Sequence, residues 1–590
     1  MSRASQGRLA LLGLVILSAL YLGEISGYPL QDPDEGRYAE IPREMIESGD
    51  WVTPRLNYVV YFEKPPLMYW LVALSFEVFG QSEGAARAVS AVSGILTVVL
   101  IYLLGRAVLG PRAALLGAGV LATSPIFFVL AQALTIDMLL TACMTATMVA
   151  FFFACRSERK GPWVAAVSVS AALGVLAKGP VALVLPGLVA LAWLAWQRDG
   201  KTLGALLRPV PLLAFVVVVV PWFVLVSRAN PEFLEFFFVR EHWERFTAEV
   251  GHPEGPFYYL PVLLAGPLPW TAVAIGLACT REGRVAFGEI PREVRAFLIL
   301  WGLLIIGFFT VASSKLATYI LPALPPLALV AGGWLDRVVE REALARGLLR
   351  WLGGVLFFAG TFVVVLSAIA WPLESTLAQW FGGDDEDVAA IVVATALSGA
   401  AFGVTGFLVA RSRLLRGAPP ATVLLVLVLG FGLGVFGALP GRAVVKTSEQ
   451  LSRVVDAEYR DGDLVVFYKK LWQGMPFYTG RRVGMVRSFD EVWHGVEISP
   501  DREQYYWDEL APLVREWNSG RRVFVLTNWE MVPEIARFVD SEPRLLSRDR
   551  RRVVVVNFAP AREGERRDGE AGAPGLPQGD GAGVAAPSGG

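Results

Sequence analysis

The sequence predicts a polytopic α-helical membrane protein that carries a small α/β domain at its C-terminal end. Of its 590 residues, 54% are hydrophobic and the mean hydropathy is +0.50, which is more apolar than a soluble core of this size requires. Apolar runs of roughly 17 to 25 residues, the length of a helix that crosses hydrocarbon, recur over the first 440 residues. Beyond Pro440 they give way to short β-branched segments.

The apolar runs predict about thirteen transmembrane helices. They lie near 9–29, 85–109, 113–131, 138–155, 162–177, 180–197, 209–227, 258–279, 295–312, 318–334, 348–371, 389–410 and 420–438. A shorter run over 67–80 follows two prolines and contains Glu77, so we expect it to lie at the membrane interface. A cleaved signal peptide over residues 1–27 is the alternative interpretation of the first run.

The basic residues predict the orientation of these helices. Arg and Lys gather in every second loop, for example at Arg106 and Arg112 and again at Arg198 and Lys201. Because short basic loops stay on the cytoplasmic side, these loops are expected inside and the others outside. The first loop, about 30–84, then faces outward. An odd number of spans places the C-terminal region outside as well.

The C-terminal region is expected to fold separately. Segments 463–470, 522–528 and 552–558 have the composition of strands and alternate with helical patterns around 446–460, 505–518 and 529–539. We therefore divide the chain into a transmembrane domain over 1–440, an extracytoplasmic α/β domain over 441–560 and a tail over 561–590. The tail contains mainly Gly, Ala, Pro and charged residues and is expected to be disordered.

Composition and motifs exclude several classes of function. A net charge of −1 indicates no nucleic-acid partner. Cys143, Cys155 and Cys279 lie in or beside apolar runs, so a disulfide framework or a cysteine metal site is not expected. The chain has no Walker-type phosphate loop, no G-x-G-x-x-G after a strand and no G-x-S-x-G elbow. A nucleotide cofactor is therefore not expected.

The first loop is the first candidate active site because it concentrates charge in an apolar chain. It contains Asp32-Pro33-Asp34-Glu35-Gly36-Arg37-Tyr38-Ala39-Glu40 and Tyr61-Phe62-Glu63-Lys64-Pro65-Pro66. A charge at the centre of the bilayer costs about 2.5 to 3.5 kcal/mol on insertion scales, so such a cluster usually has a function. Further outward positions are Asp137, Lys178, the loop over 228–252 with His242 and Arg245, and Lys315 and Tyr319.

These residue types suit the transfer of a sugar from a lipid phosphate. Lys64, Lys178, Arg245 and Lys315 can hold a phosphate leaving group. Glycosyl transfer builds positive charge on the sugar and negative charge on the leaving oxygen, so a carboxylate together with cations meets both needs. Structural alternatives stay open: Asp137 could cap its helix, Lys64 could pair with Glu63, and the other cations could extend from helix ends towards water.

The motifs resemble the bacterial aminoarabinose transferases of lipid A. The resemblance is carried by Asp34 to Met45, Ser48-Gly49-Asp50-Trp51, Tyr61 to Pro65, Ala177-Lys178-Gly179-Pro180, Glu241-His242 with Arg245-Phe246, Pro256 to Pro261 and Lys315 to Pro322. More broadly, the chain is similar to the GT-C glycosyltransferases, which include the protein mannosyltransferases. Asp32 before the motif and Gly36, where the aminoarabinose enzymes commonly carry Thr, depart from the pattern and leave the sugar open.

The resemblance implies roles for individual residues. Asp34 would be the catalytic carboxylate and Asp137 the second acidic residue, while Tyr61, Lys64, Lys178, Arg245 and Tyr319 would surround the donor phosphate. The predicted binding set also includes Glu35, Arg37, Tyr38, Glu63, His242 and Lys315. Transfer would invert the sugar centre. An anionic lipid A phosphate as acceptor would need no general base, whereas a hydroxyl would need one.

The sequence thus predicts a plasma-membrane glycosyltransferase that takes a sugar from an undecaprenyl-phosphate-type carrier and passes it to lipid A. Glycosylation of Ser or Thr in exported proteins is the second reading. A secondary transporter and a sensor protein are alternatives of other classes. No cofactor is expected to be required, and a divalent cation held by Glu63, His242 and His252 is the alternative.

Overall fold

The computed structural model describes residues 3–23, 25–244, 253–373, 392–393, 395–397, 399–400, 402–404, 406–408, 447–487 and 489–558. The chain forms two compact units. The helical unit contains Met1–Glu449 together with Leu471–Arg482 and Phe489–Gln504. The sheet unit contains Gln450–Lys470, Val483–Ser488 and the chain from Tyr505. The contiguous domain expected over 441–560 is therefore divided between the two units.

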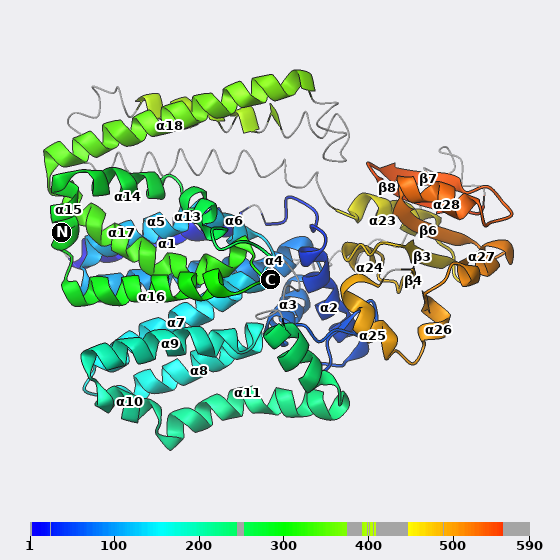
Figure 1. The fold of residues 1–590 in the computed structure, drawn as a ribbon, viewed down its shortest axis with the longest axis horizontal. Coiled ribbons are helices and arrows are strands. Elements are labelled where there is room, and N and C mark those ends of the chain that lie inside the picture. Colours follow the sequence, from blue (N-terminus) through cyan, green and yellow to red (C-terminus); the bar gives the residue numbers. More distant parts are fainter. Residues whose placement is uncertain are drawn as a thin grey trace, which may run out of the picture. The chain divides into compact units, whose positions relative to one another are not determined.

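Helices dominate the helical unit, where α7, α8, α9, α11 and α16 lie side by side (Figure 1). Its elements up to the middle of the chain are α1 (Arg3–Leu22), α2 (Asp34–Ser48), β1 (Arg55–Leu56), β2 (Val59–Val60), α3 (Leu67–Phe79), α4 (Glu83–Val108), α5 (Pro111–Ala122), α6 (Pro125–Gln132), α7 (Ile136–Arg156), α8 (Lys160–Lys178), α9 (Val181–Gln197) and α10 (Gly200–Leu206). They are followed by α11 (Pro209–Ala229), η1 (Glu235–Glu244), α13 (Tyr259–Ala265), α14 (Trp270–Cys279), α15 (Arg281–Gly288), α16 (Arg292–Val311), η2 (Ala317–Ala323), α17 (Leu324–Val339), α18 (Glu342–Ala370) and η3 (Trp371–Leu373).

The predicted membrane spans are found as helices. Among the described residues, seven helices are long and apolar enough to cross a membrane, or up to nine if each of two bent pairs is one span. Together with the shorter apolar helices α1 and α9, they coincide with every predicted span from 9–29 to 348–371. The predicted span over 389–410 is described only in part, and the one over 420–438 lies outside the described residues. The chain is a multi-pass membrane protein.

Two of the predicted spans are bent rather than straight. Helices α5 and α6 meet at 65°, and α13 and α14 meet at 93°. Pro125 begins α6, and the residue before it, Ser124, is extended. Pro267 and Pro269 lie between α13 and α14. Proline lacks an N–H donor and disfavours a helical residue before it, so these positions end one helix and begin the next.

The first loop contains more regular structure than the sequence predicts. Helix α2 occupies 15 residues of it, with most of its side chains buried despite their charge. Helix α3, expected at the interface, begins after Pro66 and is 13 residues long, which is too short to span the bilayer. It exposes Leu74, Val78 and Phe79, as expected for a helix against lipid.

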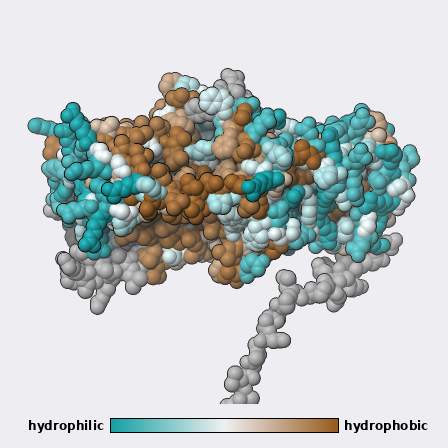
Figure 2. Space-filling view, turned by 90° about the horizontal axis from the view of Figure 1, so that it is seen from below, coloured by the Kyte–Doolittle hydropathy of each residue, from teal (hydrophilic) through white to brown (hydrophobic). Residues whose placement is uncertain are grey.

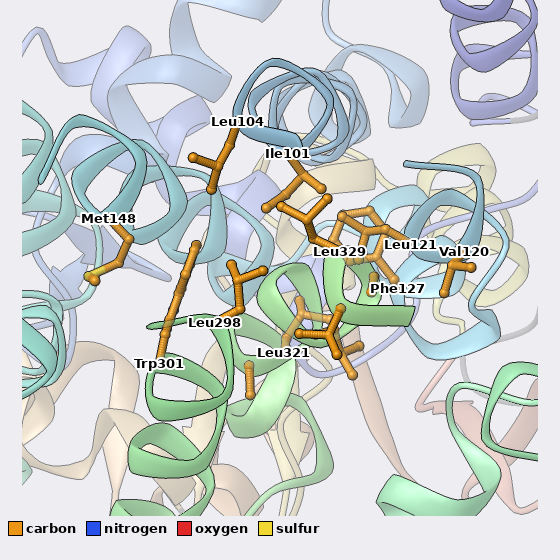
Figure 3. Close-up of a cluster of buried hydrophobic side chains, with 14 of the residues drawn as sticks. Ile101, Leu104, Val120, Leu121, Phe127, Met148, Leu298, Trp301, Leu321 and Leu329 are labelled. Carbon is orange, nitrogen blue, oxygen red and sulfur yellow. The ribbon is translucent and has the colours of Figure 1, made fainter. Parts of the chain in front are cut away.

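Close helix packing builds the core. Figure 3 shows Leu329 of α17 beside Ile101 of α4 and Leu121 of α5. A Cβ atom at Gly332 would lie 2.3 Å from the backbone nitrogen of Gly117, so the small residue permits α17 to approach α5. Figure 2 shows a broad apolar surface over the helices of this unit and a polar surface at the end that carries α10 and α15.

The sheet unit has six strands in the order β5-β4-β3-β6-β8-β7. Strands β3 (Leu464–Tyr468), β4 (Gly484–Val486), β5 (Tyr506–Trp507) and β6 (Val523–Asn528) are parallel, and β8 (Arg552–Val556) and β7 (Arg544–Asp549) join antiparallel. The predicted strands correspond to β3, β6 and β8. Helices α23 (Glu449–Glu458), α27 (Ala511–Asn518), η6 (Trp529–Met531) and α28 (Val532–Ala536) connect the strands, and α26 (Arg502–Tyr505) begins in the segment Phe489–Gln504 of the helical unit. Helices α24 (Gly474–Thr479), η5 (Asp490–Val492) and α25 (Trp493–Glu497) lie in the segments that pack in the helical unit.

Candidate active site

Helix α2 presents two neighbouring carboxylates in opposite environments. Asp34 begins the helix and its side chain is 65% exposed, whereas Glu35 is buried. Both lie in the first turn, where the helix dipole favours negative charge. Asp34 is therefore the carboxylate of this pair that a substrate can reach.

Glu35 links the start of α2 to α4 and to the chain before α7. Its oxygens accept hydrogen bonds from Arg87 Nε at 2.8 Å and from Arg87 Nη2 at 2.7 Å. They also accept from the backbone N–H of Gln31 at 2.9 Å and of Leu134 at 2.8 Å. Because Leu134 directly precedes α7, this contact sets α2 against the helix that carries Asp137. These four donors indicate that Glu35 positions the start of α2, and its predicted role in substrate binding stays a prediction.

Arg37 contacts three polar side chains of the site. Its guanidinium donates to Asp34 Oδ1 at 3.0 Å and to the Tyr61 hydroxyl at 2.8 Å, and it pairs with Glu491 at 3.0 Å. Its Cζ lies 5.4 Å from the ring centroid of Tyr38. Burial by itself would lower the pKa of Arg37, but Tyr61, Glu491 and Asp34 raise it well above its ordinary value. A charged guanidinium thus stands beside the candidate catalytic carboxylate.

Lys64 lies against a second carboxylate from a distant part of the chain. Its Nζ forms an ion pair with Glu241 of η1 and donates to the backbone oxygen of Glu63 at 3.0 Å. The Glu63 carboxylate is 3.8 Å away. His242 donates from Nδ1 to the backbone oxygen of Phe237 at 2.7 Å, since a carbonyl can only accept. The structure thus brings Lys64, Glu63 and Glu241 together, and His242 is the residue that follows Glu241 on η1.

Gly179 fits η1 against the end of α8. Its φ of +91° is a conformation that favours glycine. A Cβ atom there would lie 2.7 Å from His242 Nε2, so a side chain at this position would displace the imidazole. The predicted binding residue His242 is therefore packed close to Lys178.

Asp137 and Lys178 form an ion pair that joins the start of α7 to the end of α8. Lys178 Nζ also lies 4.4 Å from the ring centroid of Tyr319 on η2, within the range of a cation–π contact. The side chains of the pair are 13% and 16% exposed. Asp137 therefore has a specific cationic partner beyond any effect on its helix terminus.

Lys315 is placed differently from the other predicted cations. Its Nζ donates to the backbone oxygens of Glu254 at 2.8 Å and Ala312 at 2.6 Å, and the residue is 4% exposed. These contacts hold the chain before η2 in place and do not direct the ammonium to a ligand. Arg245 and His252 lie outside the described residues.

Tyr38 is a buried phenol on α2, next to Arg37. Burial raises the pKa of the Tyr38 phenol, Arg37 lowers it, and the charges of Asp34 and Asp137 raise it further. Tyr38 on α2 therefore lies within electrostatic range of both carboxylates. Among the described residues, no group of three or more His, Cys, Asp or Glu side chains has the arrangement of a metal site.

Three functional neighbours were not named from the sequence. Arg87 is fully buried, and an arginine near the outward end of the predicted span over 85–109 is a signal that could have identified it. Glu491 and Gln473 belong to the C-terminal region, where Gln473 Nε2 donates to Glu491 Oε1 at 2.9 Å. Nothing in their local sequence indicates that they meet the first loop.

An apolar groove of about 410 Å³ opens near this cluster. It is lined by α6, by α13 with the following Gly266, and by Ala317 and Thr318 at the start of η2. Tyr319 is the next residue along η2, and its ring contacts Lys178. The groove and the Lys178–Tyr319 contact therefore share the helix η2.

Comparisons with known proteins show which families and which individual proteins this chain is similar to. Residues 63–226 match the family model described as dolichyl-phosphate-mannose-protein mannosyltransferase, and 451–557 match the aminoarabinose transferase C-terminal domain. An undecaprenyl phosphate-alpha-4-amino-4-deoxy-L-arabinose arabinosyl transferase of Edwardsiella ictaluri is 32% identical over 60% of this chain and 64% of its own length. Its counterpart in Pseudomonas savastanoi pv. phaseolicola is 35% identical over 60% of this chain and 67% of its own length.

Solved structures extend the likeness to the fold. The crystal structure of ArnT from Cupriavidus metallidurans bound to undecaprenyl phosphate has a TM-score of 0.80 and 28% identity, covering 93% of this chain and 98% of that protein. Its apo form has a TM-score of 0.78 over 94% and 99%. The sequence alignments span less than two thirds of the Edwardsiella relative and 65% of a Pseudomonas fluorescens relative. The predicted resemblance and fold class are confirmed, and the chain belongs to the aminoarabinose transferase-like family of GT-C membrane proteins.

Proposed function

We propose that this protein is an integral membrane glycosyltransferase that moves a sugar from a polyprenyl-phosphate carrier to a cell-envelope acceptor, with lipid A as the preferred acceptor. The carrying observation is the exposed Asp34 carboxylate beside the buried Arg37 guanidinium. Relatives named as arabinosyl transferases, and a solved relative bound to undecaprenyl phosphate, support the choice of donor. The site would face the extracytoplasmic side of a bacterial plasma membrane.

The donor would be held by its phosphate and by its chain. Lys64 and Lys178 each form an ion pair, with Glu241 and with Asp137, and the carboxylate partly offsets the cost of burying the ammonium group. A donor phosphate would add a second anion to one or both ammonium groups. The polyprenyl chain would enter the apolar groove that begins at Ala317 and Thr318, where it needs no polar partner.

Transfer would then proceed by inversion at the anomeric carbon. The acceptor oxygen forms a bond to this carbon while the bond to the carrier phosphate breaks, and the phosphate leaves with the electron pair. The lysine ammonium groups stabilise the charge on the leaving phosphate. Asp34 orients a phosphate acceptor, which is already anionic, or removes the proton of a hydroxyl acceptor. Because side-chain cations supply the positive charge, no metal is required, and transfer should persist in EDTA.

Protein O-glycosylation is the second candidate function. It is favoured by the match of residues 63–226 to the protein mannosyltransferase family model, which covers α4 to α9 completely. Both candidates use the same donor chemistry and the same Asp34. They differ in whether the acceptor presents a phosphate or a hydroxyl group.

Mass spectrometry of lipid A and of envelope proteins from isogenic cells tests the proposal. Cells would carry no gene copy, the wild type, Asp34→Asn, or Glu77→Gln as a matched change at an exposed carboxylate on α3. A sugar-sized increment on lipid A in the wild type and Glu77→Gln, lost in Asp34→Asn, is the expected result. An increment confined to protein would select O-glycosylation. No increment in either pool would contradict the proposal.

A further inference from the structure

Two segments of the C-terminal region pack as part of the helical unit. These are Leu471–Arg482 and Phe489–Gln504, which interrupt the strands of the sheet unit along the sequence. The Asp32 carboxylate accepts a hydrogen bond from the backbone N–H of Gly474 at 2.7 Å, and the Tyr478 hydroxyl accepts one from the N–H of Leu30 at 2.7 Å. The segment that begins at Leu471 is thus bonded to the chain just before Asp34.

The close approach depends on a glycine in the first turn of α2, Gly36. A Cβ atom at Gly36 would lie 2.4 Å from the backbone nitrogen of Gly474, so only glycine leaves room for this backbone. Asp32 and Gly36 therefore lie against the same residue, Gly474. Together they dock the C-terminal segment on the first turns of α2.

This docking places Glu491 against Arg37. Glu491 Oε2 lies 3.0 Å from Arg37 Nη2, and Gln473 Nε2 donates to Glu491 Oε1 at 2.9 Å. The same Arg37 nitrogen donates to Asp34 Oδ1 at 3.0 Å. The buried guanidinium is thus shared between an exposed carboxylate on α2 and a largely buried one from the C-terminal segment.

We propose that Glu491 is a positioning residue for the transfer reaction, acting on Asp34 through Arg37. This inference rests on the proposed function. Glu491 and Asp34 share the positive charge of Arg37. Arg37 therefore orients Asp34, while Glu491 weakens the ion pair between Arg37 and Asp34. Loss of the Glu491 charge leaves Asp34 as the remaining charged one of the two carboxyl groups that contact Arg37 Nη2 at 3.0 Å. The guanidinium then shifts towards Asp34, and a displacement of this kind near the reacting atoms can cost up to about 100-fold in rate.

The surroundings of Glu491 make this coupling sensitive to pH. Burial raises the pKa of Glu491, the charges of Glu63 and Asp34 raise it further, and Arg37 and Gln473 oppose the rise. Acidification therefore protonates Glu491 above the pH at which a free glutamic acid would titrate. Protonated Glu491 has no negative charge to share the ion pair with Arg37, so the rate of transfer should fall as the pH is lowered.

The test measures kcat and KM for the full chain between pH 5 and 9, with an undecaprenyl-phosphate-linked sugar as donor. Glu491→Gln should lower kcat by about tenfold at neutral pH, change the donor KM less than twofold, and remove the acid limb that Glu491 sets. Glu491→Asp should restore part of the rate and the acid limb. Glu497→Gln, an exposed change on α25, should match the wild type.

A second readout follows Arg37 itself. Phenylglyoxal labelling at Arg37, quantified by peptide mass spectrometry, should rise several-fold in Glu491→Gln but not in Glu497→Gln, because the former releases one side of the guanidinium. Superimposable pH profiles and equal labelling in an active wild type and Glu491→Gln would overturn this inference alone. A wild-type protein that transfers no sugar would overturn the proposed function, and this inference with it.

Discussion

The Glu35 carboxylate and the Arg87 guanidinium form a forked contact inside the helical unit, with nitrogen–oxygen distances of 2.8 and 2.7 Å. Arg87 also donates to the backbone oxygens of Ile25, Tyr28 and Pro29. The pair therefore fixes the chain before α2, the start of α2 and α4 in one arrangement. Because Asp34 precedes Glu35 in the first turn of α2, this contact of Glu35 also fixes the position of Asp34.

Glu35→Ala should destabilise the protein by about 3 to 5 kcal/mol, because it leaves the buried Arg87 charge without its counterion. The loss should appear as a lower thermal midpoint in detergent and as a lower yield of folded protein. Glu77→Gln, at an exposed position on α3, should stay within about 0.5 kcal/mol of the wild type. Equal midpoints for Glu35→Ala and the wild type would contradict the positioning role.

The Asp137–Lys178 pair predicts coupled effects on catalysis. Asp137→Asn and Lys178→Met should each lower kcat/KM, and the double variant should lose less than the sum of the two effects. The interaction free energy is expected between about 0.5 and 3 kcal/mol, as for residues in contact. Lys201→Met, at an exposed lysine in α10, is the matched control and should have no effect. Additive losses would show that the two residues act separately.

The fold was largely predictable because its main determinants are local. A run of apolar residues of membrane length is sufficient to indicate a span, and the spans predicted up to 348–371 are present as helices. The bends at Pro125 and Pro269 were missed, although the signal is local, because hydropathy alone does not distinguish a bent pair from a straight span. The strands β4 and β5 were missed because they contain only three and two residues.

The candidate site was predictable as a list of charged residues but not as an arrangement. The charged motif of the first loop pointed to Asp34, Arg37 and Lys64. Yet Arg37 also pairs with Glu491 of the C-terminal region, and Lys64 pairs with Glu241, which is 177 residues away in sequence. Helix α2 was predicted only as a charged loop because its burial depends on such distant contacts. Glu35 differs from Asp34 by one position, and only the structure shows that it faces Arg87.

Gly36→Ala should weaken the docking of the C-terminal segment. The added Cβ would lie 2.4 Å from the Gly474 nitrogen and 2.8 Å from the Gln473 carbonyl carbon, so backbone must move. We expect at least a tenfold loss of transfer, because the shift carries Gln473 and Glu491 away from Arg37. Limited proteolysis within 471–482 should also become faster.

The matched control for this change is Gly187→Ala in α9. A Cβ atom at Gly187 meets no atom within 4 Å, and alanine has the higher helix propensity. This variant should therefore keep wild-type activity and proteolysis. Normal transfer by Gly36→Ala would show that the glycine is not needed for the site.

Glu44 predicts that the stability of the protein falls as the pH rises above the ordinary pKa of a glutamic acid. Glu44 and Glu40 are 2% and 0% exposed on adjacent turns of α2, and Arg43 binds Glu40 through two contacts of 2.7 Å. Glu44 accepts a hydrogen bond from the backbone N–H of Tyr58 at 2.9 Å. Burial raises the pKa of Glu44 well above 4.5, and the charge of Glu40 raises it further. Glu44 is therefore protonated in the folded protein at pH values where the unfolded chain has lost this proton.

A raised native pKa means that the folded state binds the proton more tightly than the unfolded state. The favourable contribution is complete below the unfolded pKa of about 4.3 and declines as the pH rises towards the native pKa. Glu44→Gln keeps the acceptor for Tyr58 and carries no charge, so it should remove this decline. Between pH 5 and 9, the thermal midpoint of Glu44→Gln should therefore rise relative to that of the wild type. The midpoint of Glu77→Gln should follow the wild type over the same range. Parallel midpoint curves for Glu44→Gln and the wild type would show that Glu44 titrates alike in the folded and unfolded chains.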